Sequence, residues 1–254
     1  MMIAYIKEEV LLAVKRKGTY AYIAGIVILC LLANLAMLAF RSIYGMNDGS
    51  HAYNLILFAE WLFVIPYYST ILIADIIFGK EYPNPHIKTR VTAKLNRTKR
   101  YIGKLIAGIV LSAMLVVIAI VLFFGATLLL LSDDTIGLWT VVDFCQKVAI
   151  AVPLWIAGIA IANSMLFCFE NKKHAYAAFF TIVFLIPRIV LFLASERIAI
   201  GFFVAVKQYI LITPRFDELQ YFYTLNIPQI ILTGVVYTVL FTIIGIVCFR
   251  KKEF

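Results

Sequence analysis

Six long apolar runs constrain the fold of this chain more than any other feature of its sequence. A helix needs about 20 predominantly apolar residues, at about 1.5 Å each, to cross the hydrocarbon core of a bilayer. In lipid only helices and closed barrels satisfy every backbone polar group, and the sequence lacks the short alternating segments of barrel strands. The sequence therefore predicts an all-α integral membrane protein with one membrane domain over residues 1–254. The six predicted spans cover residues 19–40, 53–78, 101–131, 142–169, 175–194 and 227–249.

The composition and the distribution of charge agree with this class. Hydrophobic residues make up 63% of the chain, whereas about half is typical of soluble proteins. The formal net charge is +9, and 17 of the 23 Lys and Arg residues lie in alternate polar segments, which are the two ends of the chain and the loops after spans two and four. Such loops face the cytoplasm. We therefore predict a multi-pass membrane protein, in contact with the lipid bilayer, with both termini cytoplasmic and no nucleic-acid partner.

The start of the chain predicts a helix that lies in the membrane interface. Over residues 2–17, Ile3, Ile6, Val10 and Val14 fall on one helical face, and basic residues lie elsewhere. A basic start before an apolar run also describes a signal peptide, but a first run of about 22 residues is longer than the usual apolar region. We therefore expect the first span to be retained.

Span two carries three residues that are unusual in a membrane helix: Glu60, Pro66 and Asp75. Charged side chains at membrane depth are costly and usually face protein or water. Two interpretations of Glu60 stay open, a lining or gating role and a hydrogen bond to another span. We expect Asp75 to pair with a lysine such as Lys80, and Pro66 to kink the helix.

Span five is interrupted by Pro187 and Arg188. A proline beside a cation in an apolar run predicts a broken helix, with Arg188 facing a cavity or a carboxylate. Residues 195–226 follow, and the apolar run of nine within them, 198–206, is too short to span. We predict a re-entrant or interfacial helix on the outer side before span six.

The loop between spans two and three, residues 79–104, is the longest strongly polar interval between two long apolar runs. Within it Ile87, Val91 and Leu95 recur every four residues, which places them on one face of a helix. We predict a short amphipathic helix over residues 85–95. A basic helix of this kind fits either an acidic groove on another protein or anionic lipid. The charged residues of the loop are the acid Glu81 and the cations Lys80, Lys88, Arg90, Lys94, Arg97, Lys99, Arg100 and Lys104.

No catalytic or cofactor-binding motif is present in the sequence. It lacks GxxxxGK[ST], HExxH, GxSxG and CxxC, and its three histidines lie in different loops. The four cysteines show neither metal-binding nor disulfide spacing. We therefore expect that this chain is not itself an enzyme and binds no metal and no cofactor.

The layout and the first inner loop together resemble the type-2 permease subunits of ABC exporters. The layout combines an amphipathic start, six spans, a long basic first inner loop, a tiny second inner loop and an outer re-entrant segment. The chain departs from the family at Pro85-His86, where a Gly-Thr-like pair is frequent, so the resemblance does not define where the short helix begins. The matching loop positions are Glu81-Tyr82, Ile87-Lys88-Thr89, Arg97-Thr98-Lys99 and Gly103-Lys104.

The resemblance implies that residues 85–95 form a coupling helix, which docks on a separate nucleotide-binding ATPase subunit that holds ATP and Mg. It also implies alternating access between two copies of this unit, or between two similar permeases, with spans two and five facing the pathway. We expect Glu60, Pro66 and Arg188 to line or gate the pathway. The implied ATPase contacts are Glu81, Pro85, Ile87, Lys88, Val91, Lys94, Leu95 and Arg97.

The function implied by the resemblance is export of an amphipathic or lipid-like molecule, such as an antimicrobial or toxin peptide, across a bacterial cell membrane. An alternative from another class is an ATP-independent secondary carrier or channel, in which Glu60 and Arg188 would act directly. A membrane enzyme would need a catalytic constellation that the sequence does not contain.

Overall fold

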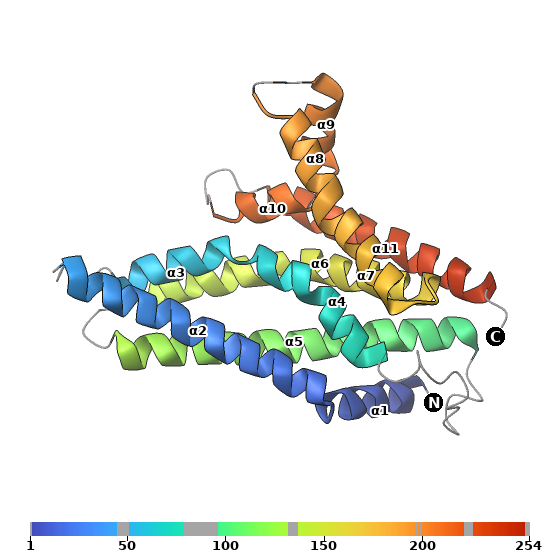
Figure 1. Ribbon diagram of the computed structural model, residues 1–254, viewed down its shortest axis with the longest axis horizontal. Helices are drawn as coiled ribbons and strands as arrows, with labels where there is room; N and C mark the ends of the chain where they lie inside the picture. Colours follow the sequence, from blue (N-terminus) through green and yellow to red (C-terminus); the bar gives the residue numbers. More distant parts are fainter. Residues whose placement is uncertain are drawn as a thin grey trace.

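The computed structural model describes residues 2–44, 51–78, 96–131, 137–196, 198, 200–220 and 226–251, and all regular structure within them is helical (Figure 1). In chain order the helices are α1 Met2–Val14, α2 Lys17–Tyr44, α3 His51–Trp61, α4 Val64–Phe78, α5 Arg97–Leu130, α6 Leu138–Cys168, α7 Lys172–Phe180, the π-helix η3 Thr181–Leu185, α8 Ile186–Leu193, α9 Gly201–Tyr209, α10 Thr213–Glu218 and α11 Ile227–Lys251.

Five helical stretches among the described residues are long and apolar enough to cross a membrane. They are Lys17–Ile43, Arg97–Leu130, Leu138–Cys168, Lys172–Leu193 and Ile227–Arg250. Helices α3 and α4 pass the same test as a pair and make a sixth span if the 55° bend between them is counted as a break within one span. By length and composition, the predicted class of an all-helical multi-pass membrane protein is confirmed.

The helices begin and end a few residues from the predicted bounds. Every span except the last starts earlier than predicted, and α5 at Arg97 and α6 at Leu138 start earliest relative to their predicted bounds. Gly137 precedes α6 in an extended conformation. The basic residues that open α5 hid its start, because they interrupt the apolar run without breaking the helix.

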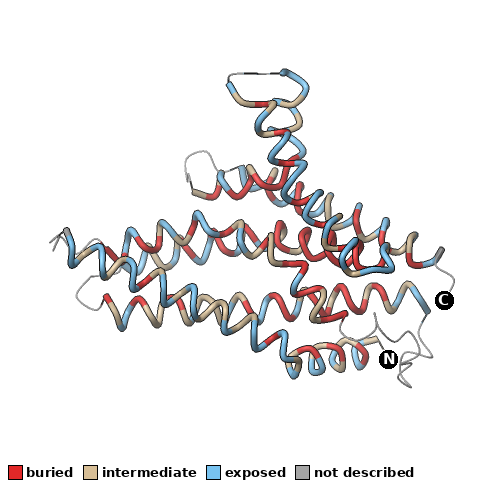
Figure 2. The backbone as a smooth tube through the Cα atoms, viewed as in Figure 1, coloured by how far each residue is buried: buried red, intermediate tan, exposed pale blue. Residues whose placement is uncertain are grey.

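Helix α6 lies at the centre of the bundle. It is the most deeply buried of the candidate spans, whereas α2 is almost wholly exposed (Figure 2). Small residues allow neighbouring helices to approach it closely. A Cβ on Gly158 of α6 would lie 2.8 Å from the ring of Tyr67 on α4, and one on Gly234 of α11 would lie 2.7 Å from the backbone of Pro153.

Helix α1 packs against α5. Its fully buried positions are Tyr5, Glu9 and Ala13. On the apolar stripe predicted for a membrane-interface helix, Ile3 is 83% exposed and the other residues are partly buried. That the helix lies on membrane lipid stays a prediction. Tyr5 sets the contact, because a Cβ on Gly103 of α5 would lie only 2.6 Å from its ring.

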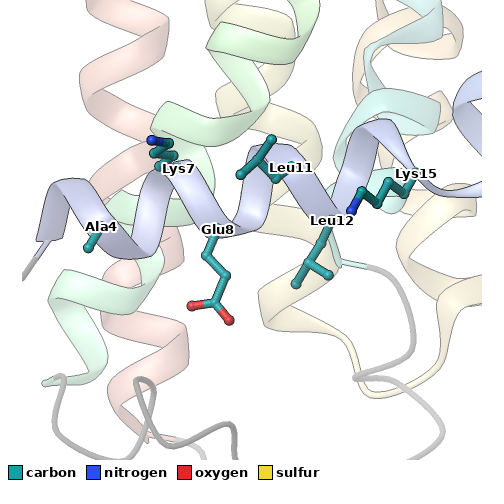
Figure 3. Close-up of a pocket in the computed structure, with 6 residues that line it drawn as sticks. All are labelled: Ala4, Lys7, Glu8, Leu11, Leu12 and Lys15. Atoms are coloured by element: carbon teal, nitrogen blue, oxygen red, sulfur yellow. The ribbon is translucent and has the colours of Figure 1, made fainter.

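The outer face of α1 carries a surface hollow lined entirely by that helix. Figure 3 shows Lys7 and Glu8 pointing to opposite sides of the helix. Because no second element contributes to its wall, this hollow has no depth in which to hold a ligand. Its lining residues are Ala4, Lys7, Glu8, Leu11, Leu12 and Lys15.

The segment predicted to be re-entrant contains two short helices, α9 and α10. Helix α9 packs beside α8, and in Figure 1 the two project away from the long bundle. Helix α10 lies beside the bundle and buries Phe216 against Tyr67 of α4, with ring centroids 5.6 Å apart. Whether this segment re-enters a membrane stays a prediction.

Candidate functional site

Span two is broken just before Pro66, as predicted. Helix α3 ends at Trp61 and α4 begins at Val64, with a bend of 55°. Pro66 lies in the first turn of α4, where its missing N–H costs least, and its ring would clash with the carbonyl of Leu62 in a continuous helix. The indole of Trp155 donates a 2.9 Å hydrogen bond to the carbonyl of Phe63 at the break. The break is therefore stabilised by a hydrogen bond from a neighbouring helix.

Span five continues where the sequence predicted a break. Residues Thr181–Leu185 form a π-helix immediately before Pro187, and the span runs unbroken over Lys172–Leu193. In an α-helix the ring of Pro187 would clash with the carbonyl of Val183. The wider π-turn removes this conflict without ending the helix. The predicted interruption is thus a change of helix type.

These two irregular segments contact each other. The ring of Tyr68, two residues after Pro66, lies edge-on to the ring of Phe184 in the π-helix, with centroids 5.7 Å apart. The guanidinium carbon of Arg188 lies 5.4 Å from the centroid of Phe184. Tyr67 continues the row of rings toward α10. The fold therefore brings the bend of span two and the π-helix of span five together, and Arg188 lies beside their contact.

Arg188 lies within electrostatic range of a carboxylate, although the two form no ion pair within 4 Å in the described part of the chain. Asp217 of α10 interacts electrostatically with Arg188 and with Lys207 of α9. Although Asp217 is exposed in the single chain, protein packed around it raises the pKa of its carboxyl by desolvation, and the two cations oppose that rise. We call Tyr68, Phe184, Arg188, Lys207 and Asp217 the broken-helix site.

Glu60 lies apart from this site, on the other side of the break. Its Oε2 accepts a 2.8 Å hydrogen bond from Nζ of Lys147 on α6, and the same Nζ lies 2.8 Å from Oδ2 of Asp143. Glu60 and Lys147 are both buried. The geometry matches the predicted hydrogen bond to another span, and a gating role for Glu60 stays a prediction.

The last turn of α4, just before the basic loop, is held by cations from three other segments. Arg16 donates to the carbonyl of Ile76. Lys104 of α5 donates to the carbonyl of Ile77 at 3.4 Å. Lys172 of α7 lies 2.5 Å from Oδ1 of Asp75. Cations at this position are favourable because unpaired carbonyls give the carboxyl end of a helix a partial negative charge.

Asp75 forms an ion pair with a lysine from a distant part of the chain. This is Lys172, from the second inner loop, while the lysine named in the prediction, Lys80, lies outside the described residues. The hydroxyl of Tyr176 also donates to Asp75, at 3.3 Å. The prediction considered only sequence neighbours, whereas the fold brings the start of α7 to the end of α4.

Lys104 is the most enclosed cation at this end of the bundle. It is 1% exposed, its Nζ lies 3.7 Å from Oε1 of Glu9 on α1, and it lies 5.1 Å from the ring centroid of Phe78. Sequence analysis grouped Lys104 with the cations of the loop. It predicted neither the burial of Lys104 nor its ion pair with Glu9.

Most of the predicted ATPase contacts cannot be placed on the fold. Arg97 opens α5 and donates to the carbonyl of Arg250 at 3.1 Å, which ties α5 to the end of α11. Arg250 in turn donates to the hydroxyl of Thr98 at 2.8 Å. The remaining predicted contacts lie outside the described residues: Glu81, Pro85, Ile87, Lys88, Val91, Lys94 and Leu95.

Within the described ranges, no three His, Cys, Asp or Glu side chains are grouped closely enough to hold a metal ion. Comparison with known proteins identifies no relative, because no family model matches the chain and no curated protein matches it significantly. The resemblance to exporter permeases therefore stays a prediction from residues and layout.

Proposed function

We propose that this chain is the membrane permease subunit of an ATP-driven ABC exporter. Residues 85–95 would dock on a separate ATPase subunit that holds ATP and Mg, and the basic end of the bundle would face the cytoplasm. Two such permease units would move an amphipathic or lipid-like molecule by alternating access. The chain itself would catalyse no reaction.

The observation that carries this proposal is the set of contacts around the last turn of α4. A docking segment transmits motion only if its ends are joined firmly to the membrane helices. Lys104 joins the first turns of α5 to the carbonyl of Ile77, so the two ends of the basic loop are held together. Arg16 and Lys172 extend this connection to the α1–α2 turn and to α7.

The broken-helix site supports the same function. Irregular backbone at membrane depth is tolerated where it is enclosed by protein or lines a water-filled cavity. Here the bend of span two and the π-helix of span five meet through Tyr68 and Phe184. A pathway between spans two and five would run past this contact.

Site-specific crosslinking from the apolar stripe tests the proposal. A photo-crosslinking residue at Val91 should join the chain to one ATPase subunit in native membranes, and purification should recover the two in equal amounts. The same residue at Lys7, on the outer face of α1, is the control and should not capture that subunit. Recovery of a chain that transports in liposomes without any nucleotide-binding partner would contradict the proposal.

One observation favours the alternative of an ATP-independent carrier. The Glu60–Lys147 pair is buried between α3, the first half of the bent span, and α6, which is long and apolar enough to cross a membrane. Paired ionisable residues at such depth often mark ion or proton pathways. Under this alternative, removing the charge of Glu60 stops transport, and no ATPase is required.

A further inference from the structure

The guanidinium of Arg188 is directed toward the middle of span five. Its carbon lies over the ring of Phe184, one turn earlier and near the centre of Lys172–Leu193. An arginine that reached for lipid headgroups from this position would extend toward the nearer end of the span. Arg188 remains exposed in the single chain, so its charged group is accessible to a ligand.

Among the described residues, Arg188 forms no ion pair within 4 Å. Asp217 acts on Arg188 only at longer range, and it acts in the same way on a second cation, Lys207. The guanidinium therefore has no directly bound carboxylate beside these apolar helices. An uncompensated charge away from water is costly, so a ligand that brings one negative group is favoured at this place.

The surroundings of this charge are apolar on the accessible side. The rings of Tyr68 and Phe184 meet edge-on beneath the guanidinium. The exposed face of the span on either side of Arg188 is formed by large apolar side chains, which can cover a hydrocarbon tail. These side chains are Leu185, Ile186, Ile189 and Phe192.

We propose that the broken-helix site binds the anionic group of a free amphipathic molecule at Arg188, with the apolar part of that molecule along the exposed face of α8. This inference rests on the proposed function, because it names the chemical class of the exported molecule. The ligand is a carboxylate or phosphate joined to an apolar chain, and it is distinct from the bilayer's own lipid.

A binding assay with two probes that differ only in charge tests this. The full chain is placed in phosphatidylcholine nanodiscs, and energy transfer is measured from its tryptophans to dansyl-labelled undecanoate or to the uncharged dansyl-labelled undecanamide. The wild-type chain should bind the carboxylate about tenfold more tightly than the amide, as expected for a hydrogen bond to a charged group. Arg188→Gln should abolish this preference, and Arg188→Lys should keep part of it.

Two further variants control for effects of the substitutions on folding. Asp217→Asn removes the acid that competes with the ligand, so it should bind the carboxylate more tightly than the wild-type chain does. A gain of this kind cannot come from loss of structure. Lys173→Gln is the matched control, because it removes an exposed cation at the other end of the same span and should leave the preference unchanged.

Three results would overturn the proposal: equal affinity of the wild-type chain for both probes, an undiminished preference in Arg188→Gln, or loss of the wild-type preference in phosphatidylglycerol nanodiscs. The last result would mean that a bilayer headgroup occupies the site. The assay contains no ATPase, so its failure would leave the exporter proposal standing. Failure to find an ATPase partner would likewise leave the binding result intact.

Discussion

Lys147 and Glu60 form an ion pair between α6 and α3, with Nζ and Oε2 2.8 Å apart and both side chains almost wholly enclosed. Lys147 lies equally close to Asp143, one turn earlier on its own helix. One cation therefore holds two acids, and it joins the first half of the broken span to the central helix. The second half, α4, is held to α6 by separate contacts.

The shared cation predicts unequal costs for removing the two partners. Lys147→Met leaves Glu60 without its partner, so we expect it to cost about 3–5 kcal/mol of stability, as for other broken buried pairs. Glu60→Gln leaves Lys147 paired with Asp143 and should cost less, about 1–3 kcal/mol. Thermal unfolding in detergent, followed by tryptophan fluorescence, measures both.

The double variant Glu60→Gln/Lys147→Met is the control for this pair. It removes the unpaired carboxylate, so it should be more stable than Lys147→Met alone. If the two losses simply add, the pair does not interact as the structure shows.

The sequence identified Glu60, Pro66 and Arg188 because each breaks a local rule. A charge or a proline in an apolar run can be recognised without any knowledge of the fold. Their contacts could not be recognised in the same way. Lys147 lies 87 positions from Glu60, and only the packing of α3 against α6 brings the two together.

The same limit applies to the packing of α1 and to Lys104. Apolar periodicity predicted a helix at the start of the chain, and the helix is present over Met2–Val14. The buried face was set by Tyr5, which packs on Gly103, a contact that periodicity does not encode. Glu9 and Lys104 are buried as a pair, and neither is marked in the sequence as different from the exposed charges beside it.

Lys104 should be far more important for stability than an exposed lysine on the same helix. Lys104→Met leaves Glu9 buried without a cation and removes the donor to Ile77. We expect a loss of about 3–5 kcal/mol. Lys99→Met, at an exposed position of α5, should change stability by less than about 0.5 kcal/mol. Equal effects in thermal unfolding would contradict the buried position of Lys104.

Gly234 should tolerate no side chain, because a Cβ there would lie 2.7 Å from the backbone of Pro153. Backbone cannot rotate away as a side chain can, so Gly234→Ala should force α11 from α6 at a cost of about 1–3 kcal/mol. Gly125→Ala is the matched control, because nothing lies within 4 Å of its position. It should be neutral or stabilise by up to about 1 kcal/mol through helix propensity. Thermal unfolding of the two variants, measured in parallel, tests whether only Gly234→Ala is destabilising.

The exporter and carrier proposals make opposite predictions for Val91 and Glu60. Val91 lies on the apolar stripe of the predicted docking helix, so Val91→Asp places a charge where the exporter proposal requires an apolar groove on the ATPase. We expect at least a tenfold weaker association with the ATPase and ATP hydrolysis that no longer drives transport. Thr92→Asp adds the same charge beside the stripe and should have a smaller effect on both.

Glu60→Gln completes this comparison, because the carrier proposal places the essential charge there. In an exporter, Glu60→Gln should lower stability while the protein that remains folded still couples hydrolysis to transport. In a carrier, it should abolish transport, and Val91→Asp should leave transport intact. Transport into membrane vesicles should be measured with and without ATP for the wild-type chain, Val91→Asp, Thr92→Asp and Glu60→Gln. It separates the two proposals, because the exporter requires Val91 and the carrier requires Glu60.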